Sequence, residues 1–226
     1  MTPLLIPGAE YVGSEGCAMC HEKEHKYFQL SEHASVTIKA SEDQPVQAEG
    51  CETCHGPGSL HIEGRGDTTK ILRGKPETCF ACHLDIRGKF QLQHHHPVPE
   101  GQMSCSDCHS LHGNDVRATG GLALQGKNEK CFRCHKEQKG PFVFEHDAMR
   151  EGCPNCHNPH GSVYDKLLVA GQTTTCLRCH WQASFNQPSA TLGGDSHAGR
   201  FIGQGEECID CHHSTHGSNI DRAFLR

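Results

Sequence analysis

Apolar residues occur along this chain in short clusters, separated by polar segments and by segments rich in glycine and proline. Three clusters have helical spacing: one from about residue 20 to residue 30, one beginning near Pro76, and one running from a threonine cap before Cys176 to Trp181. No stretch alternates apolar and polar residues for long enough to predict a sheet, and the longest apolar run, residues 167–170, is far below the roughly 18 residues of a membrane-spanning helix. The pattern predicts short α-helices, long loops and very little β-structure.

The composition does not support an ordinary side-chain core. Hydrophobic residues make up 35% of the 226 residues and aromatic residues 6%, whereas apolar residues including glycine usually make up about 45–50%. Something other than side chains must therefore fill the interior. The formal net charge of −6, with no basic block, argues against a nucleic-acid partner. The first residues lack a basic segment and a long apolar segment, so we expect a signal peptide to be absent from the numbered chain.

All sixteen cysteines belong to eight Cys-x-x-Cys-His motifs, which we number 1 to 8 along the chain. This motif is the attachment signature of c-type haem. Two thiols add to the two vinyl groups of one haem, and the histidine, one helical turn after the first cysteine, ligates the iron. The thioether cysteines are Cys17, Cys20, Cys51, Cys54, Cys79, Cys82, Cys105, Cys108, Cys131, Cys134, Cys153, Cys156, Cys176, Cys179, Cys208 and Cys211. The proximal histidines are His21, His55, His83, His109, His135, His157, His180 and His212.

Zinc ribbons and disulfides also use Cys-x-x-Cys pairs, but neither requires a histidine directly after the second cysteine. Eight repetitions of that histidine favour eight covalently bound c-type haems. These cofactors would fill the interior, and their covalent attachment would hold the chain around a stack of macrocycles.

Twelve further histidines can supply the second iron ligand. The chain repeats a unit with two motifs, a histidine between them and, in the last three units, a His-Gly pair after the second, which predicts four tandem dihaem units at about 11–61, 71–113, 122–161 and 167–217. Aligning the units selects eight distal ligands and leaves His25, His94, His96 and His213 as spares. The predicted distal ligands are His33, His61, His95, His112, His146, His160, His197 and His216.

Two details of this set depend on spacing. The alignment selects His95 rather than its neighbours because it precedes Gly101 by six residues, as His146 precedes Gly152. His112 follows His109 by three residues, which span at most about 10 Å and cannot pass around a haem edge. We therefore expect His112, like His160 and His216, to ligate a neighbouring haem. Bis-histidine ligation predicts low reduction potentials, because the methionine ligand that raises them is missing.

The chain resembles the MtrA/DmsE-type multihaem cytochromes of outer-membrane porin–cytochrome conduits. The matching segments are CETCHGPGSLH, HHPVPEGQMSCSDCHSLHG, CPNCHNPHGS and CIDCHHSTHGSN. Eight motifs bring it closest to the octahaem, OmaB-like branch. The resemblance implies a single elongated domain of stacked haems, placed in the periplasm and inside an outer-membrane β-barrel porin. It also implies a periplasmic donor cytochrome, an extracellular multihaem cytochrome as acceptor, and no small-molecule substrate.

Three functions compete at this stage. The leading one is electron transfer along eight haems, with no catalysis. A multihaem reductase would need an iron with an open position, whereas every motif here ends in histidine and the count of distal ligands is complete. A subunit of an extracellular cytochrome filament remains a further alternative, which micrographs of the purified protein would distinguish.

Overall fold

The computed structural model describes residues 4–39, 46–113, 128–180, 191–192, 195–196 and 207–225. The chain divides into two compact units. The first comprises Met1–Phe90 and Pro97–Gly120, and the second comprises Gln91–His96 and Gly121–Arg226. Each unit therefore contains four haem motifs. The short segment Gln91–His96 belongs to the second unit although it lies between motifs 3 and 4 in the sequence.

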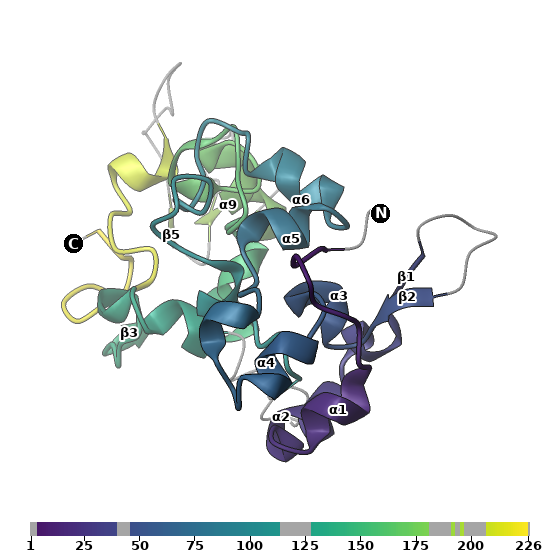
Figure 1. Cartoon of the computed structure of the whole chain (residues 1–226). Coiled ribbons are helices and arrows are strands. Elements are labelled where there is room, and N and C mark those ends of the chain that lie inside the picture. Colours follow the sequence, from purple (N-terminus) through teal and green to yellow (C-terminus); the bar gives the residue numbers. More distant parts are fainter. Residues whose placement is uncertain are drawn as a thin grey trace. The chain divides into compact units, whose positions relative to one another are not determined.

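The first unit consists of short helices joined by loops (Figure 1). The α-helices are α1 (Ser14–Ala18), α2 (Glu22–Phe28), α3 (Glu52–His55), α4 (Ser59–Glu63), α5 (Pro76–Phe80) and α6 (Leu84–Lys89). The 3₁₀ turns are η1 (Glu32–Ser35), η2 (Thr68–Lys70) and η3 (Cys105–Asp107). Strands β1 (Thr37–Lys39) and β2 (Val46–Glu49) form an antiparallel hairpin in which Ile38 pairs with Ala48.

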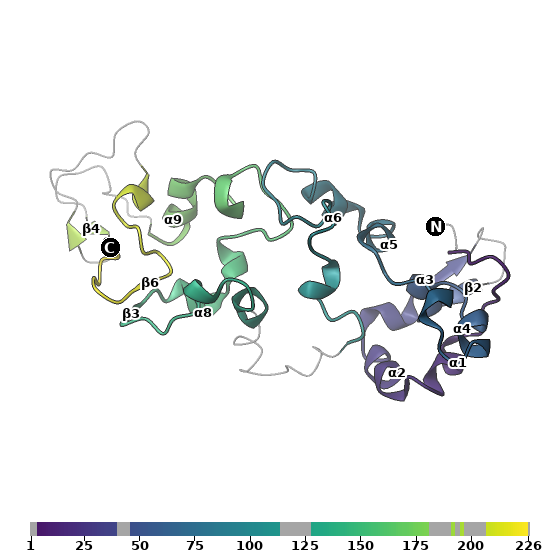
Figure 2. The same ribbon diagram turned by 60° about the vertical axis from the view of Figure 1, so that its left-hand side comes forward.

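The second unit has the same character (Figure 2). Residues 128–132 are helical and are followed by η4 (Lys136–Gln138), α8 (Ala148–Glu151), η5 (Cys153–Asn155), η6 (Asp165–Leu167), α9 (Gln172–His180) and η7 (Cys208–Asp210). Strands β3 (Phe144–Glu145) and β6 (Gly217–Ser218) pair antiparallel, as do β4 (Thr191–Leu192) and β5 (Asp195–Ser196). The β3–β6 pair joins the segment before motif 6 to the segment after motif 8.

The predicted fold class, with short helices, long loops and little strand, is confirmed. The expected helix near residue 30 ends at Phe28, and the helix expected near Pro76 begins at that residue, where a missing N–H costs nothing. Helix α9 covers motif 7, whereas Trp181 lies outside the described residues. Among the residues that the structure describes, no helix is both long and apolar enough to cross a membrane.

Side chains bury little apolar area, as the composition predicted. In the described part of the chain the buried hydrophobic side chains are those of Phe28, Ile38, Ala48, Phe90 and Val98. Such a set is far too small to stabilise 226 residues by itself. The described segments are therefore organised around the haem motifs.

Candidate haem-binding sites

Every motif closes one helical turn between its first cysteine and its histidine. The N–H of His21 donates to the carbonyl of Cys17 at 2.9 Å, and His109 repeats the bond with Cys105 at 2.9 Å. Motifs 2, 3, 5, 6 and 8 contain the same bond, and motif 7 lies within α9. The thioether positions and the proximal imidazole thus share one face, as haem attachment requires.

The first cysteines of consecutive motifs lie in contact. The thiols of Cys17 and Cys51 hydrogen-bond to each other, as do those of the corresponding cysteines in motifs 3–4, 5–6 and 7–8. In the first of these pairs, the bond from Cys17 and a second bond from Ser14 lower the pKa of Cys51 to about 5, against an opposing effect of burial. Cys208, bonded to Cys176, has a pKa of about 6 for the same main reason. Haems attached here would have neighbouring thioethers within each motif pair.

In three of the four motif pairs, a polar side chain three residues before the first cysteine of the pair contacts the first cysteine of the second motif; motif 3 has Pro76 at this position. The Ser14 hydroxyl accepts from the N–H of Cys51 at 3.2 Å, and the Asn128 amide oxygen accepts from the N–H of Cys153 at 2.8 Å. Thr173 contacts the Cys208 thiol from the same position in the last pair. The sequence reasoning missed these residues, although their constant spacing from the motif was a usable signal.

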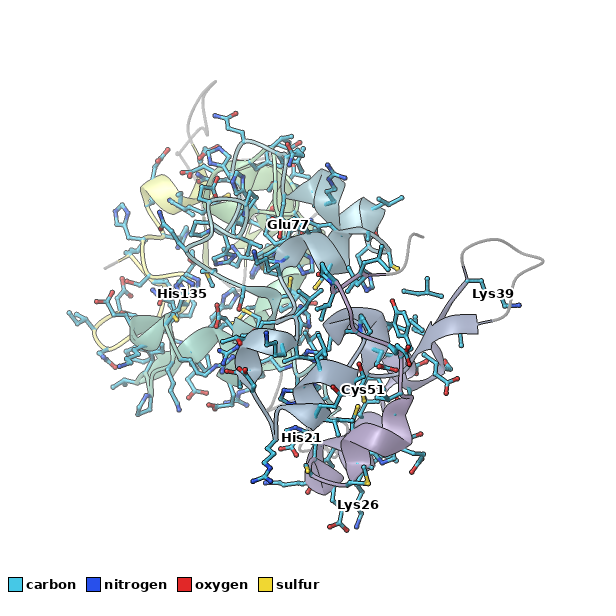
Figure 3. All side chains as sticks on the ribbon, in the orientation of Figure 1. His21, Lys26, Lys39, Cys51, Glu77 and His135 are labelled. Atoms are coloured by element: carbon cyan, nitrogen blue, oxygen red, sulfur yellow. The ribbon has the colours of Figure 1, made fainter. Side chains whose placement is uncertain are left out.

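Six motif histidines face a second histidine ring. The pairs, with the distance between ring centres, are His21–His61 (6.3 Å), His33–His83 (6.1 Å), His55–His112 (6.1 Å), His96–His135 (6.1 Å), His146–His180 (6.0 Å) and His157–His216 (6.1 Å). Figure 3 labels His21 and His135, the proximal histidines of the first motif in each unit.

These distances fit a haem iron between the rings. Imidazole nitrogen–metal bonds are about 2.0–2.1 Å long, and the nitrogen lies about 1.1 Å from the ring centre, so two imidazoles on opposite sides of one metal have centres roughly 6.2 Å apart. All six pairs lie within 0.2 Å of this value. The donor set is also chemically suitable, because two neutral imidazoles are ordinary axial ligands of c-type haem iron.

Hydrogen bonds orient several of these rings. Nδ1 of His61 donates to the carbonyl of Asp67 at 2.8 Å, and Nδ1 of His146 donates to that of Thr215 at 2.7 Å. Similar bonds hold His55, His95, His96, His157 and His212. A proton fixed on Nδ1 leaves the lone pair of Nε2 for a metal, which is the usual arrangement of ligating histidines.

Burial favours the same neutral form. Burial, with smaller effects of nearby histidines, lowers the pKa of His180 and of His216. Since only an unprotonated imidazole nitrogen can bind iron, this shift favours ligation at neutral pH.

Comparison with known proteins agrees with this chemistry. The chain is 31% identical to the multiheme cytochrome MtrA of Shewanella baltica (strain OS185), in an alignment covering 92% of this chain and 79% of that protein. The chain belongs to the MtrA family of multihaem c-type cytochromes. Residues 95–140 and 146–185 also match the doubled CXXCH motif family.

A solved structure, the undecaheme cytochrome from the S-layer of Carboxydothermus ferrireducens, aligns with 88% of this cytochrome at 17% identity. The aligned part is 38% of that chain, and the TM-score is 0.19. A score this low supports no conclusion about the fold.

Within the first unit of the cytochrome, two motif pairs exchange ligands. His33 lies between motifs 1 and 2 but faces His83 of motif 3. His112 follows motif 4 but faces His55 of motif 2. The expectation that His112 reaches a haem other than its own agrees with this placement.

The second unit repeats the exchange. His146 lies between motifs 5 and 6 and faces His180 of motif 7, while His216 follows motif 8 and faces His157 of motif 6. The short β3–β6 ladder, in which Glu145 pairs with Gly217, places both distal histidines side by side. Each of these motif pairs therefore contains a motif histidine that faces a histidine from the other pair.

The glycine after the tail histidine has a steric role. Gly113 has a φ of +77°, and a side chain there would collide with the carbonyl of Tyr27. Gly217 has a φ of +143°, and a side chain there would collide with the ring of Phe142. Glycine is needed for both the backbone conformation and the close approach.

The structure departs from the repeat alignment at the histidine triplet. His96, which the alignment left as a spare, is the ring opposite His135, whereas the alignment selected His95. His94 and Ser162 form an antiparallel bridge through two backbone hydrogen bonds, and Nδ1 of His96 donates to the carbonyl of Pro159, whereas Nδ1 of His95 donates to that of Leu92. Contacts with residues 159–162, which a repeat alignment does not contain, thus hold the His96 ring in place.

Two further predicted distal ligands, His160 and His197, are in none of these six pairs. His160 is half-buried, with its N–H 3.3 Å from the side-chain oxygen of Asn158, and His197 lies outside the described residues. Of the predicted spares, His25 contacts Glu15 at 3.6 Å and Gln29 at 3.2 Å on the surface of α1 and α2.

Proposed function

We propose that this cytochrome is a conduit that carries electrons along eight bis-histidine c-type haems. When bound, each haem supplies one-electron chemistry by cycling between ferric and ferrous iron. The protein holds the irons, fixes their spacing and sets their potentials. The observation that carries the proposal is the set of six histidine pairs whose ring centres are 6.0–6.3 Å apart.

The proposed attachment uses all sixteen cysteines and the eight motif histidines. For six irons we propose the second ligands seen opposite the motif histidines, with His96 in place of His95 at motif 5. His95, His160 and His197 remain the other candidate distal ligands. The four motif pairs act as dihaem units that are joined by exchanged ligands.

Saturated irons support a carrier rather than an enzyme. Reduction of a small molecule at haem requires an open coordination position, whereas each of the six described histidine pairs would supply two imidazoles to one iron. We therefore propose that the chain has no substrate and exchanges electrons only with other redox proteins.

We further propose a location in the periplasm and at the outer membrane, inside a porin, with a periplasmic donor cytochrome and an extracellular multihaem cytochrome as acceptor. Support comes from the 31% identity to MtrA over nearly the whole chain and from the motif segments shared with conduit cytochromes. Both partners exchange electrons by contact with terminal haems.

Two measurements test the proposal. The intact mass should exceed that of the polypeptide by roughly 4.9 kDa, at about 0.6 kDa per haem. The complex extracted from outer membranes in mild detergent should contain a porin. In liposomes loaded with reduced viologen, this complex should let an external ferric chelate oxidise the dye. A protein with fewer than eight haems would contradict electron transfer along eight haems. A cytochrome that is extracted without a porin would contradict the proposed location inside a porin.

A further inference from the structure

Motif 2 contains a buried carboxylate that no haem ligation requires. The side chain of Glu52 is 1% exposed and is among the largest fully buried side chains in the described residues. Its Oε1 accepts from the N–H groups of Val12 at 3.0 Å and Gly58 at 2.9 Å. Its Oε2 accepts from the N–H of Gly13 at 2.8 Å and, at 3.2 Å, from that of Val12.

All of the groups that contact these oxygens are N–H donors, so the side chain of Glu52 acts as a carboxylate that only accepts hydrogen bonds. A protonated carboxyl would direct its own hydrogen toward an N–H group. Three neutral amides satisfy the oxygen lone pairs without a compensating cation among them. Glu52 therefore places a negative charge in the interior of the first unit.

The charge lies beside the attachment points of the first haem pair. Glu52 directly follows Cys51, and the carbonyl of Gly13, whose N–H it binds, accepts from the Cys17 thiol at 3.7 Å. The pKa of Cys17 is raised, chiefly by its hydrogen bond to Cys51 and by burial, with smaller effects of the charges at Cys51 and Glu52. Burial, followed by the charge of Glu52, also raises the pKa of Tyr11.

The other motif pairs have no carboxylate at this position. The residues that follow the first cysteine of motifs 4, 6 and 8 are Ser106, Pro154 and Ile209. Motif 8 does contain Asp210, but its carboxylate accepts from the N–H of Glu207 on an exposed turn. The buried charge is thus specific to the first pair among these four equivalent positions.

We propose that the buried carboxylate of Glu52 lowers the reduction potential of the haems at motifs 1 and 2 by placing a fixed negative charge near them. Reduction removes one positive charge from the iron, so a nearby fixed negative charge favours the ferric state, and more strongly in a poorly solvated interior than in water. Electrons are thereby disfavoured on this pair and favoured on haems farther along the chain. The inference rests on haem attachment at motifs 1 and 2, as the proposed function requires.

The test is a spectroelectrochemical titration of the eight-haem protein and of Glu52→Gln, which removes the charge with little change in shape. Covalent attachment at four cysteines should keep the Gln variant assembled. At a fixed potential, the ratio of oxidised to reduced haem should fall at least about tenfold for two of the eight haems, which equals a rise of 59 mV for a one-electron couple. Asp210→Asn, which removes an exposed carboxylate from motif 8, should change the ratio less than about threefold.

Glu52→Asp separates charge from architecture, because it keeps the charge but is too short to bind all three amides. The proposal predicts a near-native titration for this variant. Equal shifts in the Asp and Gln variants, or no shift in either, would overturn it. A Gln variant that loses a haem or shows a high-spin signal assigns Glu52 to haem attachment and also overturns it. Failure of the proposed function would give a different result from failure of this inference, because the native protein itself would then have fewer than eight haems.

Discussion

The two four-motif units show the same exchange of facing histidines between motif pairs but differ at their first motif. In the first unit, motif 1 faces His61, which lies on α4 just after motif 2 of the same pair. In the second unit, motif 5 faces His96, which comes from a segment before motif 4 in the sequence. The ring planes are nearly parallel in the first case, at 17°, and nearly perpendicular in the second, at 65°.

Spacing along the chain accounts for this difference. A tail histidine three residues after its proximal histidine, such as His112, cannot serve that haem and faces the preceding pair. His61 follows His55 by six residues, and the intervening Gly56 and Gly58 let the chain turn into α4. The longer tail lets His61 serve motif 1 of its own pair. The histidine that faces motif 1 therefore comes from its own motif pair, whereas the one that faces motif 5 comes from the segment between motifs 3 and 4, although they lie 40 and 39 residues from the respective motif histidines.

Removing a haem should have the largest effect, and the two units should differ in its size. We expect Cys131→Ala with Cys134→Ala to reduce the yield of haem-bearing protein roughly tenfold or more, because motif 5 anchors a segment from outside its own motif pair and metal-site free energy is folding free energy. Cys17→Ala with Cys20→Ala should be milder, because His61 belongs to the same motif pair as motif 1. Haem-stained yield and intact mass measure both. Equal yields of seven-haem protein would show that ligation within a motif pair and ligation from outside it do not differ in this way.

Removing one distal ligand should have the next largest effect. His96→Ala should convert one haem, roughly one eighth of the total, to a high-spin form that binds carbon monoxide. His61→Ala should do the same at motif 1. His94→Ala is the matched control, since His94 makes its described contacts through the backbone. A high-spin signal from His95→Ala in place of His96→Ala would restore the choice made by the repeat alignment.

The sequence predicted the chemistry of each motif better than the connections between motifs. The Cys-x-x-Cys-His pattern contains both thioethers and the proximal ligand within one helical turn, so local spacing was sufficient. Composition and periodicity predicted the short helices and the small number of buried apolar side chains in the described residues. His61 stood out in the sequence by its longer spacing, and the structure explains that spacing.

Sequence reasoning predicted that tail histidines ligate a neighbouring haem, but not that they face a motif of another pair, and it predicted neither the position of His96 nor the burial of Glu52. His33 and His112 face motifs of the other pair, and a repeat alignment treats each unit as closed. The position of His96 depends on contacts of the histidine triplet with Pro159 and Ser162, which lie far from it in sequence. Glu52 is a variable residue inside a motif, and only its burial and its three amide contacts distinguish it.

A smaller effect should come from the glycines that follow the tail histidines. Gly113→Ala should weaken ligation by His112 and give a partial high-spin signal from motif 2, because the new side chain meets the carbonyl of Tyr27. Gly101→Ala is a matched control: its φ of +73° is nearly the same as that of Gly113, +77°, but nothing lies within 4 Å. Both variants incur roughly 1–2 kcal/mol of backbone strain.

Only the Gly113 variant should lose low-spin character, as followed by visible absorption. Gly217→Ala, which meets the ring of Phe142, should have the corresponding effect at motif 6 of the second unit. Identical spectra for the Gly101 and Gly113 variants would show that backbone strain, rather than close approach, explains the glycine.

The smallest effect is spectroscopic and requires no loss of stability. Four described histidine pairs have ring planes within 17–28° of parallel, whereas His33–His83 and His96–His135 cross at 69° and 65°. Parallel imidazoles split the two iron d orbitals that bond with them, and crossed imidazoles leave these orbitals nearly degenerate. The ferric protein should therefore show two low-spin EPR components, one rhombic and one strongly anisotropic.

The same variants assign these components to motifs 1 and 5. His96→Ala should remove part of the strongly anisotropic component, because motif 5 has a crossed pair, whereas His61→Ala should remove part of the rhombic component, because motif 1 has a parallel pair. The ring orientations follow from the carbonyls that hold Nδ1, those of Pro159 for His96 and Asp67 for His61. If both variants reduced the same component, the two first irons would have equivalent ligand orientations, and the contrast between ligation within a motif pair and ligation from outside it would not extend to the electronic structure of the haem.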